Sequence, residues 1–297
     1  MFISDLLALL VNGVAIGCIY AMVGIGLNIA YKPTNVFNLA QGEFVMLGAM
    51  LGWLFMSGVG LPWIVAVVAV IVLVGLFGMF EERIAVAPHF KAGAQHHGWL
   101  ISTLAFSIII INVADRVFRA DPQYVAPVPG TSTTSIALGP LTYNTHQIAI
   151  VVLTLLSIVG LDWFYNKTMI GKSISAVSED QEGARLNGIS PAYITMLSFG
   201  AGAAYCAAAG LLAAPLLLAS TSLGLALLVK GFMAMAVGGV GSNWGTLVGG
   251  ILIGCVESVG SLYLSTGTRL VLLLLLLLGL LLVRPQGLMG KPLGRAV

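Results

Sequence analysis

The sequence predicts an all-α fold, a polytopic transmembrane helical bundle of about 8–10 membrane helices. Hydrophobic residues make up 59% of the 297 positions and charged residues only 8%, whereas a soluble domain carries about 25% charged residues. The mean hydropathy is +1.03. A net charge of +2 gives no reason to expect a nucleic acid partner. We therefore expect a single transmembrane domain over residues 1–297.

About nine stretches are apolar and long enough to be membrane spans, at roughly 20 residues each. In chain order they are Leu6–Tyr31, Val36–Phe55, Pro62–Phe80, Trp99–Phe118, Gln147–Tyr165, Ala192–Leu217, Leu223–Val240, Thr246–Leu264 and Arg269–Val283. The span from Leu223 contains Lys230 and ends in a glycine cluster at residues 238–241. It is either a broken or re-entrant helix, which a membrane tolerates beside a cavity, or a span that ends in a plain turn.

Lys and Arg collect in two segments, which indicates the cytoplasmic side of the membrane. These segments are the loop of about residues 167–191 and the tail after Val283, and their basic residues are Lys167, Lys172, Arg185, Arg284, Lys291 and Arg295. The N-terminus and the Pro- and Thr-rich segment 119–146 are then expected on the outer side. Arg116 and Arg119 do not fit this scheme.

Glycine is abundant, with 37 residues, and several glycines recur at four-residue spacing within the spans. Gly13 and Gly17 share one helical face, as do Gly245 and Gly249 with Gly250 beside them. Lipid gives helices no hydrophobic reason to associate, so small residues that let backbones approach closely take over that role. We expect these faces to be helix–helix contacts.

A polar segment between two spans, Gly171–Gly188, is long enough to form a short amphipathic helix on the cytoplasmic side. Ser178 followed by Asp180 and Glu182 suits the start of a helix. The closing glycine, followed by Pro191, suits its end. The apolar residues of the segment are Ile174, Val177, Ala184 and Leu186. A capped helix held outside the membrane is what the docking of a soluble partner requires.

Three stretches of the chain carry a family resemblance. Glu182-Gly183-Ala184, followed after three residues by Gly188, resembles the EAA-x-x-x-G loop of ABC importer permeases, with Gly183 in place of the first alanine. Two others resemble the LivH-type branched-chain amino acid permeases. The matching residues are Gly13–Gly17 and Asn38–Glu43 at the opening, and Ala236–Ser242, Gly249, Gly250, Gly254 and Glu257 in the closing third. Residues 85–143 offer no match.

The resemblance implies that the segment around residues 179–188 is a coupling helix that docks in a cleft of an ATPase subunit. The residues of this contact would be Glu179, Asp180, Glu182, Gly183, Ala184 and Gly188. It also implies a multi-pass subunit of the bacterial inner (cytoplasmic) membrane that forms half of the pathway of a binding-protein-dependent ABC importer. The expected partners are a second, LivM-like permease subunit, two cytoplasmic ABC ATPase subunits, a soluble extracytoplasmic substrate-binding protein and the lipid bilayer.

The implied substrates are branched-chain or related small neutral amino acids, while relatives handle urea, short amides or aromatic acids. The chain itself is expected to hold no cofactor and to be no enzyme, with ATP and Mg²⁺ bound by the partner ATPases. Gly171-Lys172-Ser173 looks like the end of a phosphate-binding loop, but that motif needs a glycine where this chain has Asn166.

Five polar residues within the spans are candidates for the substrate pathway. Placing a charge at a helix centre costs about 2.5–3.5 kcal/mol on insertion scales, so such a residue usually faces a cavity or a partner. The five candidates are Asn38, Gln41, Glu43, Lys230 and Glu257. For the first three, the alternative is that Thr34 or Asn35 caps the second span while Glu43 is held by packing or lies near the cytoplasmic interface. Lys230 and Glu257 are candidates for an ion pair that either holds the structure or gates the pathway.

Two other classes of protein also fit the composition. A secondary transporter driven by an ion gradient would typically show internal repeats, and there is only a faint echo between Leu39–Gly52 and Met235–Gly249. A membrane-embedded enzyme or channel would need a catalytic cluster or a ring of pore-lining charges, and neither is visible in the sequence. No metal site is expected, because His89, His96 and His97 have no Cys or acidic residue at metal-ligand spacing.

Overall fold

The structure of the chain is a computed structural model that describes residues 2–91, 98–118, 121–134, 136–138 and 141–290. The helices are α1 (Phe2–Tyr31), α2 (Gln41–Trp53), α3 (Trp63–Glu81), α4 (Ala87–Lys91), α5 (Gly98–Phe118), α6 (Thr145–Lys167), α7 (Met169–Glu179), α8 (Gln181–Leu186), α9 (Pro191–Leu217), α10 (Leu223–Gly238), α11 (Asn243–Gly260) and α12 (Thr266–Val283). Two π-helical turns, Leu54–Gly58 and Glu82–Val86, extend α2 and α3. A short antiparallel ribbon of β1 (Ile136–Leu138) and β2 (Leu141–Tyr143) precedes α6. The predicted all-α fold is confirmed.

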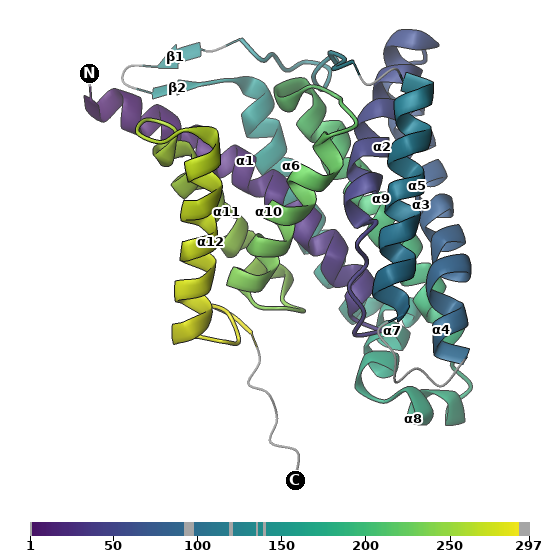
Figure 1. Cartoon of the computed structure of the whole chain (residues 1–297). Helices are drawn as coiled ribbons and strands as arrows, with labels where there is room; N and C mark the ends of the chain where they lie inside the picture. Colours follow the sequence, from purple (N-terminus) through teal and green to yellow (C-terminus); the bar gives the residue numbers. More distant parts are fainter. Residues whose placement is uncertain (1, 92–97, 119–120, 135, 139–140, 291–297) are drawn as a thin grey trace.

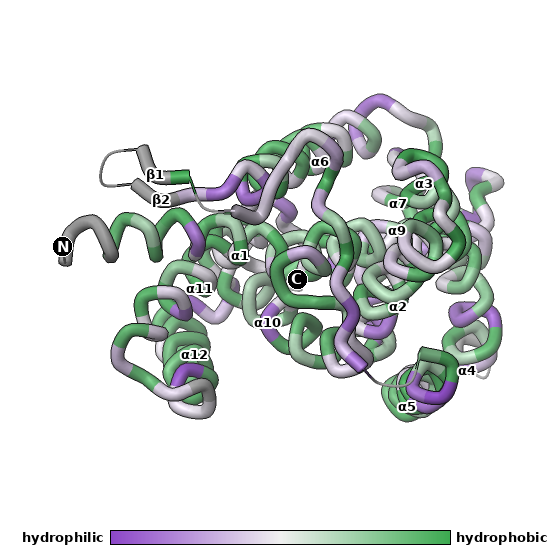
Figure 2. Tube along the Cα trace, turned by 90° about the horizontal axis from the view of Figure 1, so that it is seen from above, coloured by the Kyte–Doolittle hydropathy of each residue, from purple (hydrophilic) through white to green (hydrophobic). Residues whose placement is uncertain are grey.

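The long helix α1 runs obliquely through the centre of the bundle (Figure 1). It packs against α11, α9 and α10, and α9 in turn packs against α2 and α3. Seen from above, α5, α6 and α12 lie at the periphery (Figure 2). The central helices are therefore enclosed by other helices.

The peripheral helices expose large apolar side chains. Ile101 on α5, Leu156 on α6 and Leu275 on α12 are all exposed, and hydrophobic residues extend along most of the helices in Figure 2. Contiguous apolar patches of this extent are rare on soluble monomers, whereas a lipid-facing surface requires them. The predicted polytopic membrane protein is confirmed.

By length and hydropathy, five helices in the described residues can cross a membrane, or six if α10 and α11 form one bent span. Two other predicted spans are helical but do not count among these five helices. The predicted span Val36–Phe55 becomes helical only at Gln41, because residues 35–40 form an irregular linker in which Asn35 has a positive φ of 54°. The leucine-rich segment Gly267–Val283 in α12 is a shorter apolar helix.

A sharp bend of 118° joins α10 to α11. Gly239 and Gly241 lie in the break with φ angles of 110° and 83°, which glycine adopts without a steric penalty. Helix α10 therefore ends at the glycine cluster, as both alternatives for this segment expected. The bend exceeds a right angle, so α11 does not continue the direction of α10.

The loop 167–191 and the described residues after Val283, 284–290, lie at one end of the bundle (Figure 1). We call it the α8 end, and it holds α7, α8 and the end of α12. The start of α1 and the β1–β2 ribbon lie at the opposite end, which we call the ribbon end. This arrangement agrees with the predicted orientation, although the sidedness itself stays a prediction.

Glycines bring α1 into backbone contact with α11. A β-carbon at Gly13 would meet the backbone of Gly254 and Cys255, and one at Gly17 would meet the backbone of Gly250. Only residues without a side chain allow this approach, which van der Waals packing between membrane helices exploits. The predicted contact face of Gly13 and Gly17 is confirmed.

The second predicted glycine face splits between two neighbours. Gly245 and Gly249 lie against the backbone of Gly238 and Ala234 in α10, whereas Gly250 faces α1. Both parts of this face are helix–helix contacts, as expected. α11 is therefore clamped between α1 and α10.

Replacing Gly17 by leucine should destabilise the bundle, because the new side chain would collide with the backbone at Gly250. Overpacking costs about 1–3 kcal/mol, and the gain in helix propensity, at most about 1 kcal/mol, offsets only part of it. We expect a lower thermal unfolding midpoint for Gly17→Leu, measured on protein purified in detergent. Gly160→Leu is the matched control, since a β-carbon at Gly160 meets nothing within 4 Å. Equal midpoints for the two variants would contradict the contact.

Candidate functional site

The polar residues predicted within the spans form two separate groups, and the first is a charged cluster. Lys230 Nζ lies 2.6 Å from Glu257 Oε1, so the two side chains form the expected ion pair. Tyr20 of α1 completes the cluster: its hydroxyl accepts a hydrogen bond from Lys230 Nζ at 2.9 Å and donates one to Glu257 Oε2 at 2.8 Å. Each of the three groups therefore bonds to the other two.

Close backbone contacts hold α1, α10 and α11 around this cluster. Gly17 of α1 lies against Gly250 of α11, and Gly24 of α1 lies against Gly231 of α10. Residues three and four positions apart share a helix face, so Tyr20 lies on the same face as both glycines. The glycine contacts thus bring the phenol within reach of both partners.

The charged cluster lines a polar cavity of about 390 Å³. The loop between α9 and α10, in which Ala219 pairs with Gln123, contributes Ser220 and Ser222 to its wall. Lys230 and Glu257 keep 22% and 17% of their side-chain surface exposed. The polar residues of the wall, besides the cluster, include Asn12, Ser220, Ser222, Ser258 and Ser261. The ion pair is therefore reachable from a cavity.

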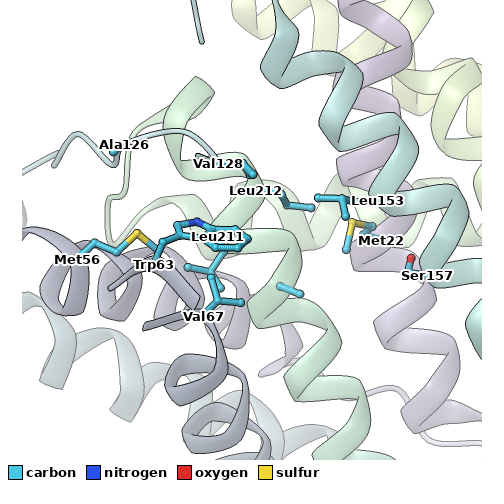
Figure 3. Close-up of a pocket in the computed structure, with 11 residues that line it drawn as sticks. Met22, Met56, Trp63, Val67, Ala126, Val128, Leu153, Ser157, Leu211 and Leu212 are labelled. Atoms are coloured by element: carbon cyan, nitrogen blue, oxygen red, sulfur yellow. The ribbon is translucent and has the colours of Figure 1, made fainter. Parts of the chain in front are cut away.

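A second cavity, of about 250 Å³, is apolar. Met22, Met56, Trp63 and Leu211 are among the side chains around it (Figure 3). Ser157 contributes a hydroxyl, which is already hydrogen-bonded to a tyrosine of α9. A charged solute would find no partner for its charge here, so the polar cavity is the better candidate for a substrate site.

The second polar group is an amide–carboxylate cluster where the linker after α1 meets α3. Asn38 Nδ2 donates to Glu81 Oε2 at 2.7 Å and to Gln41 Oε1 at 3.2 Å. Asn38 Oδ1 accepts from Ala40 N at 2.9 Å, and Gln41 Nε2 donates to Gly26 O of α1 at 3.4 Å. Asn38 and Gln41 are 1% and 0% exposed. The cluster is enclosed by protein.

Glu43 is also enclosed, with 1% exposure. Ser107 Oγ of α5 donates to its Oε1 at 3.0 Å, while Oε2 lies beside Gly224 of α10 without a hydrogen-bond partner. This geometry matches the alternative in which packing holds Glu43. The carboxyl group joins α2 to α5 and α10 inside the bundle.

Thr34 and Asn35 do not cap α2, so that part of the alternative is wrong. α2 begins after Ala40 without any side-chain capping bond. Thr34 Oγ1 instead donates to Ala30 O and accepts from Val36 N. These bonds stabilise the turn directly after α1, several residues before α2 starts.

The segment predicted as one coupling helix consists of two, α7 and α8, because Asp180 interrupts it. Asp180 has extended backbone, and its carboxylate caps α8 by accepting a hydrogen bond from Glu182 N at 2.9 Å. The prediction that Ser178 begins the helix is wrong: its hydroxyl donates to Ser175 O at 3.0 Å within α7. The predicted stop is confirmed, since Gly188 follows α8 with a positive φ of 79°.

One face of α7 and α8 is apolar and buried. Ile174, Val177 and Ala184 pack against Ile194 of α9, as the amphipathic pattern predicts. Leu186, the fourth apolar residue of that pattern, is instead 90% exposed. Of the six residues predicted to contact an ATPase, Ala184 is buried, Gly183 is partly exposed, and the exposed ones are Glu179, Asp180, Glu182 and Gly188. The two helices therefore present a surface that nothing in the described chain covers.

Two polar contacts tie α7 and α8 to the chain directly after α1. Lys32 Nζ donates to Ser175 Oγ at 3.3 Å and lies 4.0 Å from the centre of the Tyr165 ring. Gln181 Nε2 donates to Pro33 O at 3.2 Å. The segment is thus attached to the end of the central helix.

Of the three histidines considered for a metal site, the structure describes His89. It belongs to α4, and its Nε2 is 3.1 Å from Ser102 Oγ of α5. His96 and His97 lie outside the described residues. Among the residues that the structure describes, no group of three His, Cys, Asp or Glu is placed to hold a metal ion.

A comparison with known families decides the class of protein. The model of the family described as "Branched-chain amino acid transport system / permease component" matches residues 9–283. The chain belongs to this family. The resemblance to LivH-like permeases is thereby confirmed, and the family is a transport component that is not itself catalytic.

Individual relatives match over nearly the whole permease. It is 30% identical over 295 residues to the high-affinity branched-chain amino acid transport system permease protein LivH of Escherichia coli (strain K12), covering 95% of this chain and 94% of that protein. It is 31% identical over 297 residues to the permease protein BraD of Pseudomonas aeruginosa, covering 95% of each. Among solved structures, PsaBC from Streptococcus pneumoniae in complex with Fab is similar with 14% identity and a TM-score of 0.44, covering 93% of this chain and 89% of that chain. That likeness is too weak to add to the assignment.

Sequence reasoning missed Tyr20, Glu81 and Ser107. Tyr20 lies in an apolar run, where an aromatic residue is usually part of the core. Glu81 lies at the end of a predicted span, where charges are expected near the interface. One signal was available, because Tyr20 lies between Gly17 and Gly24 on a glycine-bearing face.

Asn38→Ala should destabilise the permease, because it removes the amide that donates to the buried Glu81 carboxylate. Leaving a buried polar group without its partner costs about 1–3 kcal/mol, so the thermal unfolding midpoint in detergent should fall. Asn112→Ala is the control, since Asn112 is exposed and bonds to its own helix at Ile108 O; its effect should stay within about 0.5 kcal/mol. Parent-like midpoints for both variants would show that the enclosed cluster contributes nothing to stability.

Proposed function

We propose that this chain is the transmembrane permease subunit of a binding-protein-dependent ABC importer, and that it forms half of the pathway for branched-chain or related small neutral amino acids. Membership of the permease family supports this proposal. The observation that carries it is the uncovered surface of α8, where Leu186 is 90% exposed within the segment that resembles the EAA loop. Leu186 is a large side chain of α8 that a docked protein could bury, and burial of apolar surface favours association.

The importer contains this chain, a second LivM-like permease subunit, two ABC ATPases that bind ATP and Mg²⁺, and a soluble substrate-binding protein. We place the α8 end in the cytoplasm, because the basic loop 167–191 and residues 284–290, which begin with Arg284, lie there. The ATPases then dock at α8, and the binding protein delivers solute at the ribbon end. The membrane is the inner membrane of a bacterium.

The substrate pathway passes Lys230 and Glu257 rather than the enclosed polar groups. The charged pair lines a cavity, whereas Asn38, Gln41 and Glu43 are at most 1% exposed and bond to neighbouring helices. A solute reaches these three only if the surrounding helices separate. Their role is to hold the helices around the pathway.

Alternating access follows from the way α1 connects the two ends. When the ATPases close on ATP, α7 and α8 shift. The bond of α7 to Lys32 and the bond of α8 to Pro33 carry the shift to the end of α1. α1 also carries Tyr20, so its movement alters the geometry of the Lys230–Glu257 pair. Such a change requires that the partners bind the two states with different affinities.

Leu186→Ser should weaken ATPase docking without harming the fold, because this side chain is 90% exposed in the isolated chain. Burying a leucine side chain contributes about 1.5–3 kcal/mol, so we expect a roughly 10- to 100-fold loss of affinity for the ATPase and a matching loss of ATP-driven uptake in proteoliposomes. Val59→Ser is the control: Val59 is 61% exposed near the ribbon end, so ATPase affinity should not change. An unaltered affinity for Leu186→Ser would argue against α8 as the docking helix.

The function itself is tested by purifying the chain after expression with its genomic neighbours. We expect it to carry an ABC ATPase and a second permease subunit through affinity and size-exclusion steps. ATP-driven uptake of leucine should then require the binding protein. A chain that purifies alone and transports without ATP would be a different class of transporter.

A further inference from the structure

Lys230 and Glu257 form an ion pair with each other in this structure. The ammonium and the carboxylate are 2.6 Å apart, and the Tyr20 hydroxyl bonds to both. The three side chains come from α10, α11 and α1, so the cluster joins three helices. Because the cluster also lines a cavity, a solute that occupies the cavity can contact it.

The wall of this cavity combines apolar and charged surface. The apolar part lies on α1, on the end of α9 and on the first turns of α10, and consists of Ile16, Leu217, Leu223, Ala226 and Leu227. The volume of about 390 Å³ lies within the usual range of small-molecule sites, about 300–1,000 Å³. A ligand that fits this wall has one apolar side and two opposite charges.

We propose that the cavity binds a zwitterionic α-amino acid by ion-pair exchange, with the α-carboxylate on Lys230 and the α-ammonium on Glu257. This inference rests on the proposed function and names how the substrate is held within it. The apolar side chain of the amino acid then lies against the leucine-rich wall. Tyr20, whose hydroxyl both donates and accepts, bonds to whichever charged group the opened pair leaves available.

Charge balance makes the exchange possible in a membrane. A single charge moved into the bilayer region is costly unless it has a partner. A zwitterion replaces one ion pair by two, so every charge has a partner both before and after binding. A monovalent amine or acid would satisfy one member of the pair and leave the other alone. An uncharged amide or urea offers no charge to separate the pair.

Arg269 of α12 reaches the same cavity and has interactions of its own. Lys230 and Glu257 differ from Arg269 because they form an ion pair with each other. A zwitterion can therefore offer each of them a new charged partner at the same time. The exchange therefore concerns this pair.

The experiment measures binding of radiolabelled L-leucine to the assembled importer in nanodiscs without the binding protein. Two competitors each lack one charge: 3-methylbutylamine has no carboxylate and 4-methylpentanoate has no ammonium. We expect each to compete at least tenfold more weakly than unlabelled L-leucine. Competition as strong as that of leucine by either one would overturn the inference, and this arm needs no variant protein.

Lys230→Met and Glu257→Gln should each weaken leucine binding at least tenfold. Arg116→Met is the control for loss of a charge, because Arg116 lies exposed on α5 and lines neither cavity described above; it should bind leucine like the parent. Parent-like leucine binding by Lys230→Met and Glu257→Gln in the assembled complex would show that the pair is structural only.

The double variant Lys230→Glu with Glu257→Lys separates the two roles most sharply. It keeps an ion pair, so a structural role predicts no change in leucine binding. If both charged groups of leucine bind this pair, the double variant exchanges the positions at which the α-carboxylate and the α-ammonium are held. Exchanging two substituents of a tetrahedral carbon produces its mirror image, so the preference between L- and D-leucine should change. We expect the preference for L-leucine over D-leucine to fall at least tenfold, and an unchanged preference would overturn the inference.

These outcomes are distinct from a failure of the proposed function. ATPase co-purification and ATP-driven uptake by the parent complex test the importer assignment. A complex that performs ATP-driven uptake, yet binds no leucine at this cavity, overturns the pair exchange and leaves the assignment intact. A chain that purifies without an ATPase contradicts the assignment itself.

Discussion

The close approach of α1 to α10 and α11 is the constraint on which the charged cluster depends. Lipid provides no hydrophobic force between helices, so their association relies on packing at short range. Gly17 meets Gly250, Gly24 meets Gly231, and Tyr20 lies between these two contacts on the same face. A larger residue at either contact would move α1 away by more than hydrogen bonds of 2.8 and 2.9 Å tolerate. The backbone contacts of α1 with α10 and α11 therefore bring Tyr20 within hydrogen-bond distance of Lys230 and Glu257.

The same helix joins the two ends of the permease. α1 is 30 residues long and contains no proline, so it can move as one rod. Tyr20 connects the rod to the charged pair, while Lys32 and Pro33, directly after its end, bond to α7 and α8. A displacement at α8 therefore reaches the cavity through one helix and two hydrogen bonds. This physical connection agrees with a transport cycle driven from the α8 end.

Much of this architecture could be predicted from the sequence, because the thickness and apolarity of a bilayer set the length and composition of each span separately. The glycine faces and the Lys230–Glu257 pair followed from spacing and charge. The break at Asp180 could not be located, because Ser178 and Asp180 are both good capping residues and only the packing of α7 selects between them. The role of Tyr20 depends on three helices meeting at one point, and no single stretch of sequence encodes such a meeting.

The contrast between two glutamates shows why polarity within a span is a poor guide to a pathway. Glu43 and Glu257 both lie within predicted spans, yet Glu43 is enclosed and bonded to a neutral serine, whereas Glu257 faces a cavity and a cation. A carboxylate can pass a solute onward only if the solute reaches it and can take the place of its partner. Glu257 meets both conditions, because it lines a cavity and its charged partner is an ammonium, the cation that a zwitterionic amino acid also carries. Glu43 meets neither, since its neighbours belong to the helices that close the bundle.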